Sequence, residues 1–201
     1  MTRLLPGILA MAAIVVASNI LVQFLFGNWL TWGAFTYPLA FLVTDIITRL
    51  HGARAGRQVV FVGFLVGVAC SFVAAGLDAT TVRIAVGSGL AFLTAQLIDV
   101  SIFDRLRGGS WWRAPLASTL VGSSVDTAIF FSVAFSASLA FIDPSADVSW
   151  AAEALPILGM GPVAPLWVSL AVADWGVKIA LALLALLPFR LIVAWATRAH
   201  A

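Results

Sequence analysis

The stretch TYPLAFLVTDIITRLHGARAGR, residues 36–57, runs from an apolar helical segment into a basic loop. An apolar helix that ends in clustered arginines is typical of a membrane span whose basic end lies on the cytoplasmic side. Asp45 lies inside the apolar part, and Arg49 follows four residues later on the same helix face. The stretch therefore predicts a membrane-spanning helix in which Asp45 and Arg49 can form an ion pair.

The composition of the whole chain indicates the same class. Its 201 residues are 62% hydrophobic and 10% charged, with a mean hydropathy of +1.08, more apolar surface than a soluble domain of this size could bury. The net charge of +2 is carried by arginines that cluster between apolar segments, so we expect no nucleic-acid partner. Cys70 is the only cysteine, and His51 and His200 have no neighbours at ligand spacing, so we expect no metal site and no cofactor.

Six apolar segments approach the length of about 20 helical residues that a bilayer core requires. We expect them at residues 4–26, 33–50, 58–77, 82–103, 115–141 and 163–187, the second being short. If both termini are cytoplasmic, Arg83 is the only basic residue of the outer loops, whereas nine arginines fall on the inner side. These are Arg3, Arg49, Arg54, Arg57, Arg105, Arg107, Arg113, Arg190 and Arg198. The predicted fold is therefore an all-α membrane protein, a single domain over residues 1–201 with six transmembrane helices and both termini cytoplasmic.

Two segments allow a second interpretation. The first apolar run follows Arg3 and could be a signal peptide, but it continues through Phe26, beyond the usual length of such a segment. The outer connection at residues 142–162 contains prolines, glycines and carboxylates. It is a solvated connection, a lid or a segment that is partly inserted into the membrane.

Five charged residues lie within the predicted spans: Asp45, Asp99, Asp126, Asp174 and Lys178. Each costs about 2.5–3.5 kcal/mol when placed at the centre of a membrane helix, so such residues normally face a bundle interior or a cavity. A rise of 1.5 Å per residue places Asp126 and Asp174 near the midplane, with Asp45 and Asp99 closer to the inner side. We expect them to line one cavity from the midplane to the cytoplasmic half.

Some of these charged residues have a possible ion-pair partner on their own helix, and others do not. Asp174 can pair with Lys178 at i,i+4, either as a structural pin or as part of a site. Asp99 and Asp126 have no basic partner on their own helices, and an unpaired buried carboxylate either takes up a proton or meets a donor-rich ligand. The chain carries no Walker A, HExxH or GxSxG motif, so we expect neither an ATPase of its own nor an enzyme active site.

Several segments resemble the queuosine precursor transporter family, within the vitamin-uptake-like membrane proteins: SNILVQF, TWGAFTYPLAFLVTDIITRLHGARAGR, AQLIDVSIFDRLR, WWRAPLASTLVGSSVDTAIFFSVAF and VADWGVK. The resemblance implies six helices in a bacterial inner membrane and import of 7-cyano-7-deazaguanine, in some members also the 7-aminomethyl analogue, for queuosine modification of tRNA. Ser123 and Ser124 depart from the family pattern, which tends to have an amide just before the Asp-Thr pair of the fifth helix.

The resemblance also implies a set of substrate contacts, since a 7-deazaguanine offers a ring N–H and an amine to a carboxylate, a carbonyl to an amide, and a flat ring to aromatic side chains. We expect Asp126 or Asp99 to bind the guanine-like edge, while a coupling proton on another carboxylate is left open. The candidate substrate-binding residues are Asn19, Gln23, Asp45, Phe92, Gln96, Asp99, Ser123, Asp126, Phe130, Asp174, Trp175 and Lys178. The amides can equally serve as links between helices.

Other classes remain open on the sequence alone. Six helices without an ATPase also fit the substrate-binding membrane subunit of an ATP-driven vitamin or nucleobase importer. A structural membrane protein would use the buried charges as pins. The expected partners are a small-molecule 7-deazaguanine and membrane lipids, and a homodimer is compatible with this interpretation.

Overall fold

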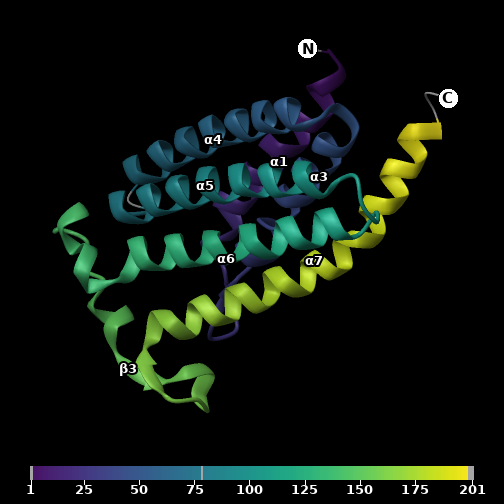
Figure 1. Cartoon of the computed structure of the whole chain (residues 1–201). Helices are drawn as coiled ribbons and strands as arrows, with labels where there is room; N and C mark the ends of the chain where they lie inside the picture. The colour runs from purple at the N-terminus through teal and green to yellow at the C-terminus, as the bar shows by residue number, and fades with distance from the viewer. Residues whose placement is uncertain (1, 78, 199–201) are drawn as a thin grey trace.

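The computed structural model of the chain describes residues 2–77 and 79–198, so His200 lies outside the described part. It is 79% helical. The α-helices are α1 (Leu5–Leu21), α2 (Gly33–Thr36), α3 (Leu39–His51), α4 (Ala53–Gly76), α5 (Val82–Leu106), α6 (Arg113–Phe135) and α7 (Leu166–Arg198). Figure 1 shows the four longest helices lying side by side, with α1 beginning and α7 ending toward the same end of the bundle.

Short elements fill the connections. The 3-10 helices are η1 (Thr2–Leu4), η2 (Ala137–Ile142), η3 (Ser149–Ala152) and η4 (Ile157–Gly159). Two antiparallel hairpins complete the described part: β1 (Leu25–Phe26) with β2 (Leu30–Thr31), and β3 (Ala154–Pro156) with β4 (Val163–Pro165).

Four helices, α4, α5, α6 and α7, are long and apolar enough to cross a membrane by length and composition. They confirm the prediction of a helical protein with several apolar spans. The first predicted span corresponds to α1, a shorter apolar helix of 17 residues. The second is divided between α2 and α3, so the count of six crossings remains a prediction.

The predicted first and second segments are wrong at their ends. The apolar run of 4–26 leaves the helix after Leu21, and its last two residues form strand β1. Gly27 turns this hairpin with φ +68°, a conformation that favours glycine because it has no Cβ. In the second segment, Pro38 separates α2 from α3, because proline has no N–H for the helical hydrogen-bond ladder.

The other segments were placed correctly, with shifted ends. The helix predicted at residues 58–77 begins earlier, at Ala53, directly after the left-handed Gly52. The fifth predicted segment, 115–141, ends as an α-helix at Phe135. The sixth begins at Leu166, because the residues before it pair in the β3–β4 hairpin, and it continues through Pro188.

Arg83 is not the loop residue that the sequence predicts. It is the second residue of α5 and is fully buried. Its Nε donates to the Val133 carbonyl at 2.6 Å, and its Nη2 donates to the Ser136 carbonyl. The guanidinium therefore binds carbonyls at the C-terminal end of α6, where the last carbonyls of a helix have no N–H partner within that helix.

The connection between α6 and α7 packs on the C-terminal end of α6 and the N-terminal end of α7. Ala151 is fully buried against Phe131 and Phe135. Asp143 accepts a hydrogen bond from Ser145 Oγ at 2.6 Å. This bond, together with the backbone N–H groups of Arg83, Ser145 and Val82, holds the pKa of the Asp143 carboxyl below its ordinary value. The connection is thus largely exposed, but Ala151 anchors it to the helix ends.

Close packing brings α3, α5 and α6 together in the middle of the bundle. A Cβ at Gly122 of α6 would lie 2.8 Å from the Phe41 ring of α3 and 3.3 Å from the Ala95 carbonyl of α5. Only a residue without a side chain fits there. This contact places the polar faces of the three helices against one another.

Candidate functional site

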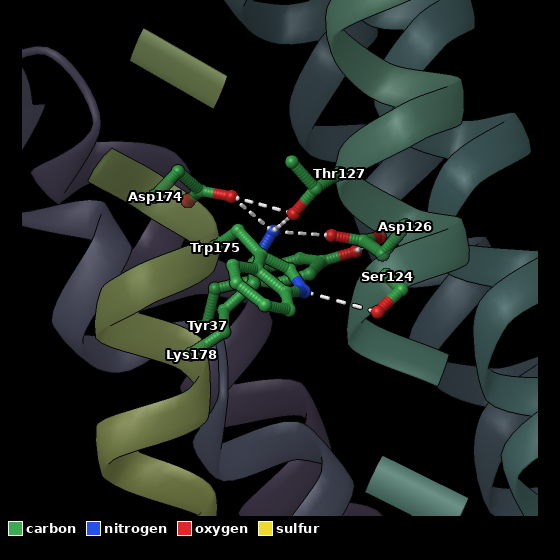
Figure 2. Close-up of polar contacts among 7 residues, drawn as sticks. All are labelled: Tyr37, Ser124, Asp126, Thr127, Asp174, Trp175 and Lys178. Carbon is green, nitrogen blue, oxygen red and sulfur yellow. Dashed lines mark hydrogen bonds and ion pairs between the residues drawn. The ribbon is translucent and has the colours of Figure 1, made fainter. Parts of the chain in front are cut away.

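The centre of the site is a buried ion-pair cluster, which we call the lysine cluster: Tyr37, Asp126, Thr127, Asp174 and Lys178. Lys178 Nζ on α7 lies 2.6 Å from Asp126 Oδ2 on α6 and 2.5 Å from Asp174 Oδ2, one turn earlier on α7. Figure 2 shows the ammonium between the two carboxylates. The predicted Asp174–Lys178 pair is confirmed. Asp126 has no basic partner on its own helix, as predicted, but it is paired all the same, because Lys178 reaches it from α7.

Hydroxyl groups complete the lysine cluster. Thr127 Oγ1 donates to Asp174 Oδ2 at 2.9 Å and accepts from Lys178 at 3.1 Å. The Tyr37 hydroxyl donates to Asp126 Oδ1 at 3.4 Å, and the Tyr37 ring centroid lies 5.8 Å from Lys178 Nζ. The ammonium is thus held by two carboxylates, one hydroxyl and one aromatic ring.

Sequence reasoning did not include Tyr37 and Thr127 among the candidates. Tyr37 is the only tyrosine of the chain and precedes a proline inside an apolar segment. Thr127 directly follows Asp126. The phenol in an apolar run was the signal that could have identified Tyr37, whereas nothing in its local sequence connects Thr127 to Asp174.

The charge balance of the lysine cluster is uneven. Two carboxylates face one ammonium, and Asp126 and Lys178 are each only 3% exposed. Removing one partner of a buried ion pair costs about 3–5 kcal/mol, because the other charge is left without compensation. A ligand that takes over Asp126 must therefore supply donors, while Lys178 keeps Asp174 as its partner.

A second polar group lies nearer the N-terminal end of α6. Ser118 Oγ donates to Asp45 Oδ1 at 3.2 Å, and Thr119 Oγ1 donates to Asp45 Oδ2 at 3.3 Å. Asp99 of α5 lies directly beside Asp45, and both are buried. We call Asp45 and Asp99 the inner carboxyl pair. Ser118 precedes Asp126 by eight residues, so the two groups are separated by about 12 Å along α6.

The predicted pairing of Asp45 with Arg49 is wrong. Arg49 Nη1 instead donates to the Arg107 carbonyl at the end of α5. The i,i+4 spacing permits the pair but does not require it, and Arg49 is only partly buried, near the loop that follows α5. Asp45 is consequently held by hydroxyl groups rather than by a charge.

The polar face predicted for α5 points into the bundle. Gln96 is fully buried and its Oε1 accepts from Thr44 Oγ1 of α3 at 2.7 Å. One turn earlier, Phe92 packs edge to face on the Tyr37 ring with centroids 5.9 Å apart. Ser123 of α6 is also fully buried, and its hydroxyl has no hydrogen-bond partner among the described residues. These three candidates lie beside the clusters, as predicted from helical spacing.

Four candidates lie elsewhere. The Asn19 amide donates to Val15 of its own helix, and Gln23 is exposed in the turn after α1. Phe130 packs against the Phe131 ring near the C-terminal end of α6. Trp175 is 44% exposed, and its indole donates to Ser124 Oγ at 3.0 Å. The structure does not bring these four into the buried clusters.

The bundle is closed around the inner carboxyl pair. A cavity of about 10 Å³ lies between α3, α6 and α7, with Asp45 and Thr119 in its wall. A cavity of this size holds about one water molecule. The conformation described is therefore closed to a ligand at this level of the bundle.

The chain is similar to curated transporters of three bacteria. It is 36% identical over 141 residues to the queuosine precursor transporter of Escherichia coli K12, which covers 61% of this chain and 64% of that protein. It is 37% identical over 137 residues to a Haemophilus influenzae protein named "Probable queuosine precursor transporter", covering 60% of this chain and 57% of that one. A Bacillus subtilis protein of the same name is 30% identical over 134 residues, covering 55% and 58%. The chain thus spans less than two thirds of these relatives.

The family comparison covers more of the chain. No solved structure matches it significantly. The sequence model described as "Putative vitamin uptake transporter" matches residues 31–193, which include every member of the lysine cluster and the inner carboxyl pair. The chain belongs to this family of vitamin uptake transporters.

Proposed function

We propose that this chain is a multi-pass inner-membrane importer of the queuosine precursor 7-cyano-7-deazaguanine, with the 7-aminomethyl form as a second candidate substrate. The observation that carries the proposal is the buried lysine cluster, in a chain whose relatives are named queuosine precursor transporters. A charged cluster inside a membrane bundle normally belongs to a substrate or ion pathway. The precursor would serve queuosine modification of tRNA in the cell.

Asp126 is the residue that we propose for the guanine-like edge. The ring N–H and the exocyclic amine of a 7-deazaguanine form a pair of donors that one carboxylate can accept. In the closed conformation Lys178 occupies Oδ2 of Asp126. Binding then requires the ammonium to move onto Asp174, which it already contacts, so the site is never left with an unpaired lysine.

Tyr37 and Phe92 are the proposed aromatic wall. Their rings pack edge to face, and Tyr37 already donates to Asp126. A planar purine-like ring bound at Asp126 would lie within reach of this pair. Discrimination would come from the polar edge, since a site that satisfies each donor rejects analogues lacking one.

The topology that we propose has six crossings and cytoplasmic termini. In it, α1 and the α2–α3 segment form the first two crossings, and α4, α5, α6 and α7 form the rest. Nine arginines on one side support this orientation. The common direction of the start of α1 and the end of α7 supports an even number of crossings.

The test is uptake of labelled 7-cyano-7-deazaguanine into bacteria that cannot synthesise it, with queuosine in tRNA as the downstream measure. Cells expressing the chain should accumulate label, and cells with the Asp126→Asn variant should not. Asp104→Asn is the matched control, because Asp104 is a partly exposed carboxylate that forms an ion pair with Arg107 near the C-terminal end of α5. Uptake that is unchanged by Asp126→Asn would favour a structural role for the charges.

A second arm separates a transporter from a subunit of an ATP-driven importer. Purified chain in liposomes without ATP should carry the labelled precursor across the membrane. Uptake that appears only when an ATPase and ATP are added would contradict the proposal that the chain works alone.

A further inference from the structure

The inner carboxyl pair is a second buried site that the proposed substrate contacts do not use. Asp45 is 2% exposed and Asp99 is 0% exposed, and they come from α3 and α5. The Asp45 carboxylate receives two hydroxyl donors, Ser118 and Thr119. Neither oxygen of Asp99 accepts a hydrogen bond from a described residue, although Asp45 and the Ser118 hydroxyl lie close to this carboxylate.

No cation of the described residues compensates the charge of the inner carboxyl pair. Of the three ion pairs within residues 2–77 and 79–198, none involves Asp45 or Asp99. Among the basic residues of the packed helices, Arg49 binds the Arg107 carbonyl, Lys178 of α7 is engaged with Asp126 and Asp174, and Arg190 stacks on Trp111. The remaining arginines at the inner helix ends are exposed: Arg54 and Arg57 of α4, Arg105 of α5, and Arg113 of α6.

A second, independent observation points to the same place. Gln96 is fully buried three residues before Asp99, and its Oε1 is fixed by Thr44, the residue beside Asp45. Its Nε2 has no acceptor within the described part of the chain. A buried donor without an acceptor on Gln96 thus lies one helical turn from buried acceptors without donors on Asp99. The cavity of about one water borders the other member of the pair, Asp45.

Two adjacent carboxylates in a dry interior cannot both be ionised, because neither solvent nor a cation offsets their repulsion. One proton between them removes the repulsion and supplies the missing donor. A metal ion is a poorer fit, since hard cations take six or more oxygens and both hydroxyls here already donate to Asp45. Among the described residues, no three His, Cys, Asp or Glu side chains gather as a metal site.

We propose that the inner carboxyl pair binds one shared proton in the closed conformation and releases it when the inner ends of α3, α5 and α6 separate. Water that enters on opening solvates both carboxylates, so the open form holds the proton less tightly. Opening toward the inner side is therefore linked to proton release and is favoured by a higher inner pH. The consequence for transport rests on the proposed import function, but proton binding itself does not.

The direct test is infrared spectroscopy of the purified chain at several pH values. The unmodified protein should show the C=O stretch of a protonated carboxylic acid, and the band should disappear as the pH rises. Asp99→Asn and Asp45→Asn should each abolish it, because an asparagine amide can donate to the remaining carboxylate without a proton. Asp104→Asn should keep the band. A band that is absent from the unmodified protein, or that persists in both Asn variants, overturns the proposal.

The second test measures uptake into liposomes with a fixed outer pH and a varied inner pH. Release of one proton on opening changes the opening equilibrium by up to about tenfold per pH unit. Uptake by the unmodified protein should rise with inner pH, whereas Asp99→Asn should bind the precursor but show a flat profile. Precursor binding by the variant verifies that it is folded, and Asp45→Asn serves as the second variant if Asp99→Asn does not fold.

The outcomes separate this proposal from the transport function. A sodium gradient that drives uptake, or an unchanged pH profile in both Asn variants, overturns the shared proton as the linked ion. An unmodified protein that shows the band but carries no 7-cyano-7-deazaguanine would show that the substrate is wrong and the proton site correct.

Discussion

Lys178 of α7 and Asp126 of α6, which are 52 positions apart in the chain, meet through Nζ and Oδ2 at 2.6 Å. The same ammonium lies 2.5 Å from Asp174. One cation thus joins two carboxylates from two helices, and it can leave one without losing the other. This arrangement gives the bundle both a structural link and a site that a donor-rich ligand can enter.

Replacing Lys178 should destabilise the bundle strongly. Lys178→Met keeps most of the side-chain volume but leaves Asp126 and Asp174 buried without a cation, at a cost of about 3–5 kcal/mol. The measurement is the free energy of unfolding by a denaturant, with the protein held in detergent. The double variant with Asp126→Asn should recover part of the loss, because the two residues are coupled directly. If Lys178→Met were as stable as the unmodified protein, the ammonium of Lys178 would not be needed to compensate the charges of Asp126 and Asp174.

The Tyr37 hydroxyl should matter more for binding than for folding. Its hydrogen bond to Asp126 is long, at 3.4 Å, so Tyr37→Phe should cost no more than about 0.5–1.5 kcal/mol of stability. The phenylalanine ring can keep its contact with Phe92. Precursor binding, measured by calorimetry on the purified protein, should weaken because Asp126 loses an orienting donor. Unchanged affinity would remove Tyr37 from the proposed site.

Gly122 should tolerate no side chain. Gly122→Val would drive a Cβ to 2.8 Å from the Phe41 ring and separate α6 from α3 and α5, and overpacking of this kind costs about 1–3 kcal/mol. Gly176→Val is the matched control, because a Cβ at Gly176 would have no other side chain and no other helix within 4 Å, apart from its two chain neighbours. Thermal unfolding of both variants should show a larger loss of stability for Gly122→Val than for Gly176→Val. A Gly176 variant that is less stable than the Gly122 variant would contradict the packing described.

Apolar length and helical spacing predicted much of this architecture. They located the long helices, including the start of α5 at Val82, and the inward face of Phe92, Gln96 and Asp99. They also identified the buried charges, since a charge inside an apolar run is visible in the sequence. The helix ends were less accurate, because Pro38 and the β3–β4 hairpin interrupt apolar runs without changing their hydropathy.

Partners between helices could not be predicted in this way. The i,i+4 rule found the Asp174–Lys178 pair and wrongly suggested the Asp45–Arg49 pair, because it describes reach on one helix and not competition from other helices. Lys178 meets Asp126, and Ser118 meets Asp45, only after α6 packs on its neighbours. The same packing left Asn19 and Gln23 on the periphery of the site, although their spacing alone suggested a polar face.

The central claim is that the chain imports the queuosine precursor through Asp126, and uptake of labelled 7-cyano-7-deazaguanine tests it most directly. Membrane vesicles or cells lacking the precursor pathway should accumulate label with the unmodified chain and with Asp104→Asn. Accumulation should fall at least tenfold with Asp126→Asn, the loss expected when about 1.4 kcal/mol of binding is removed. No accumulation by the unmodified chain at verified membrane expression, or full accumulation by Asp126→Asn, would contradict the claim.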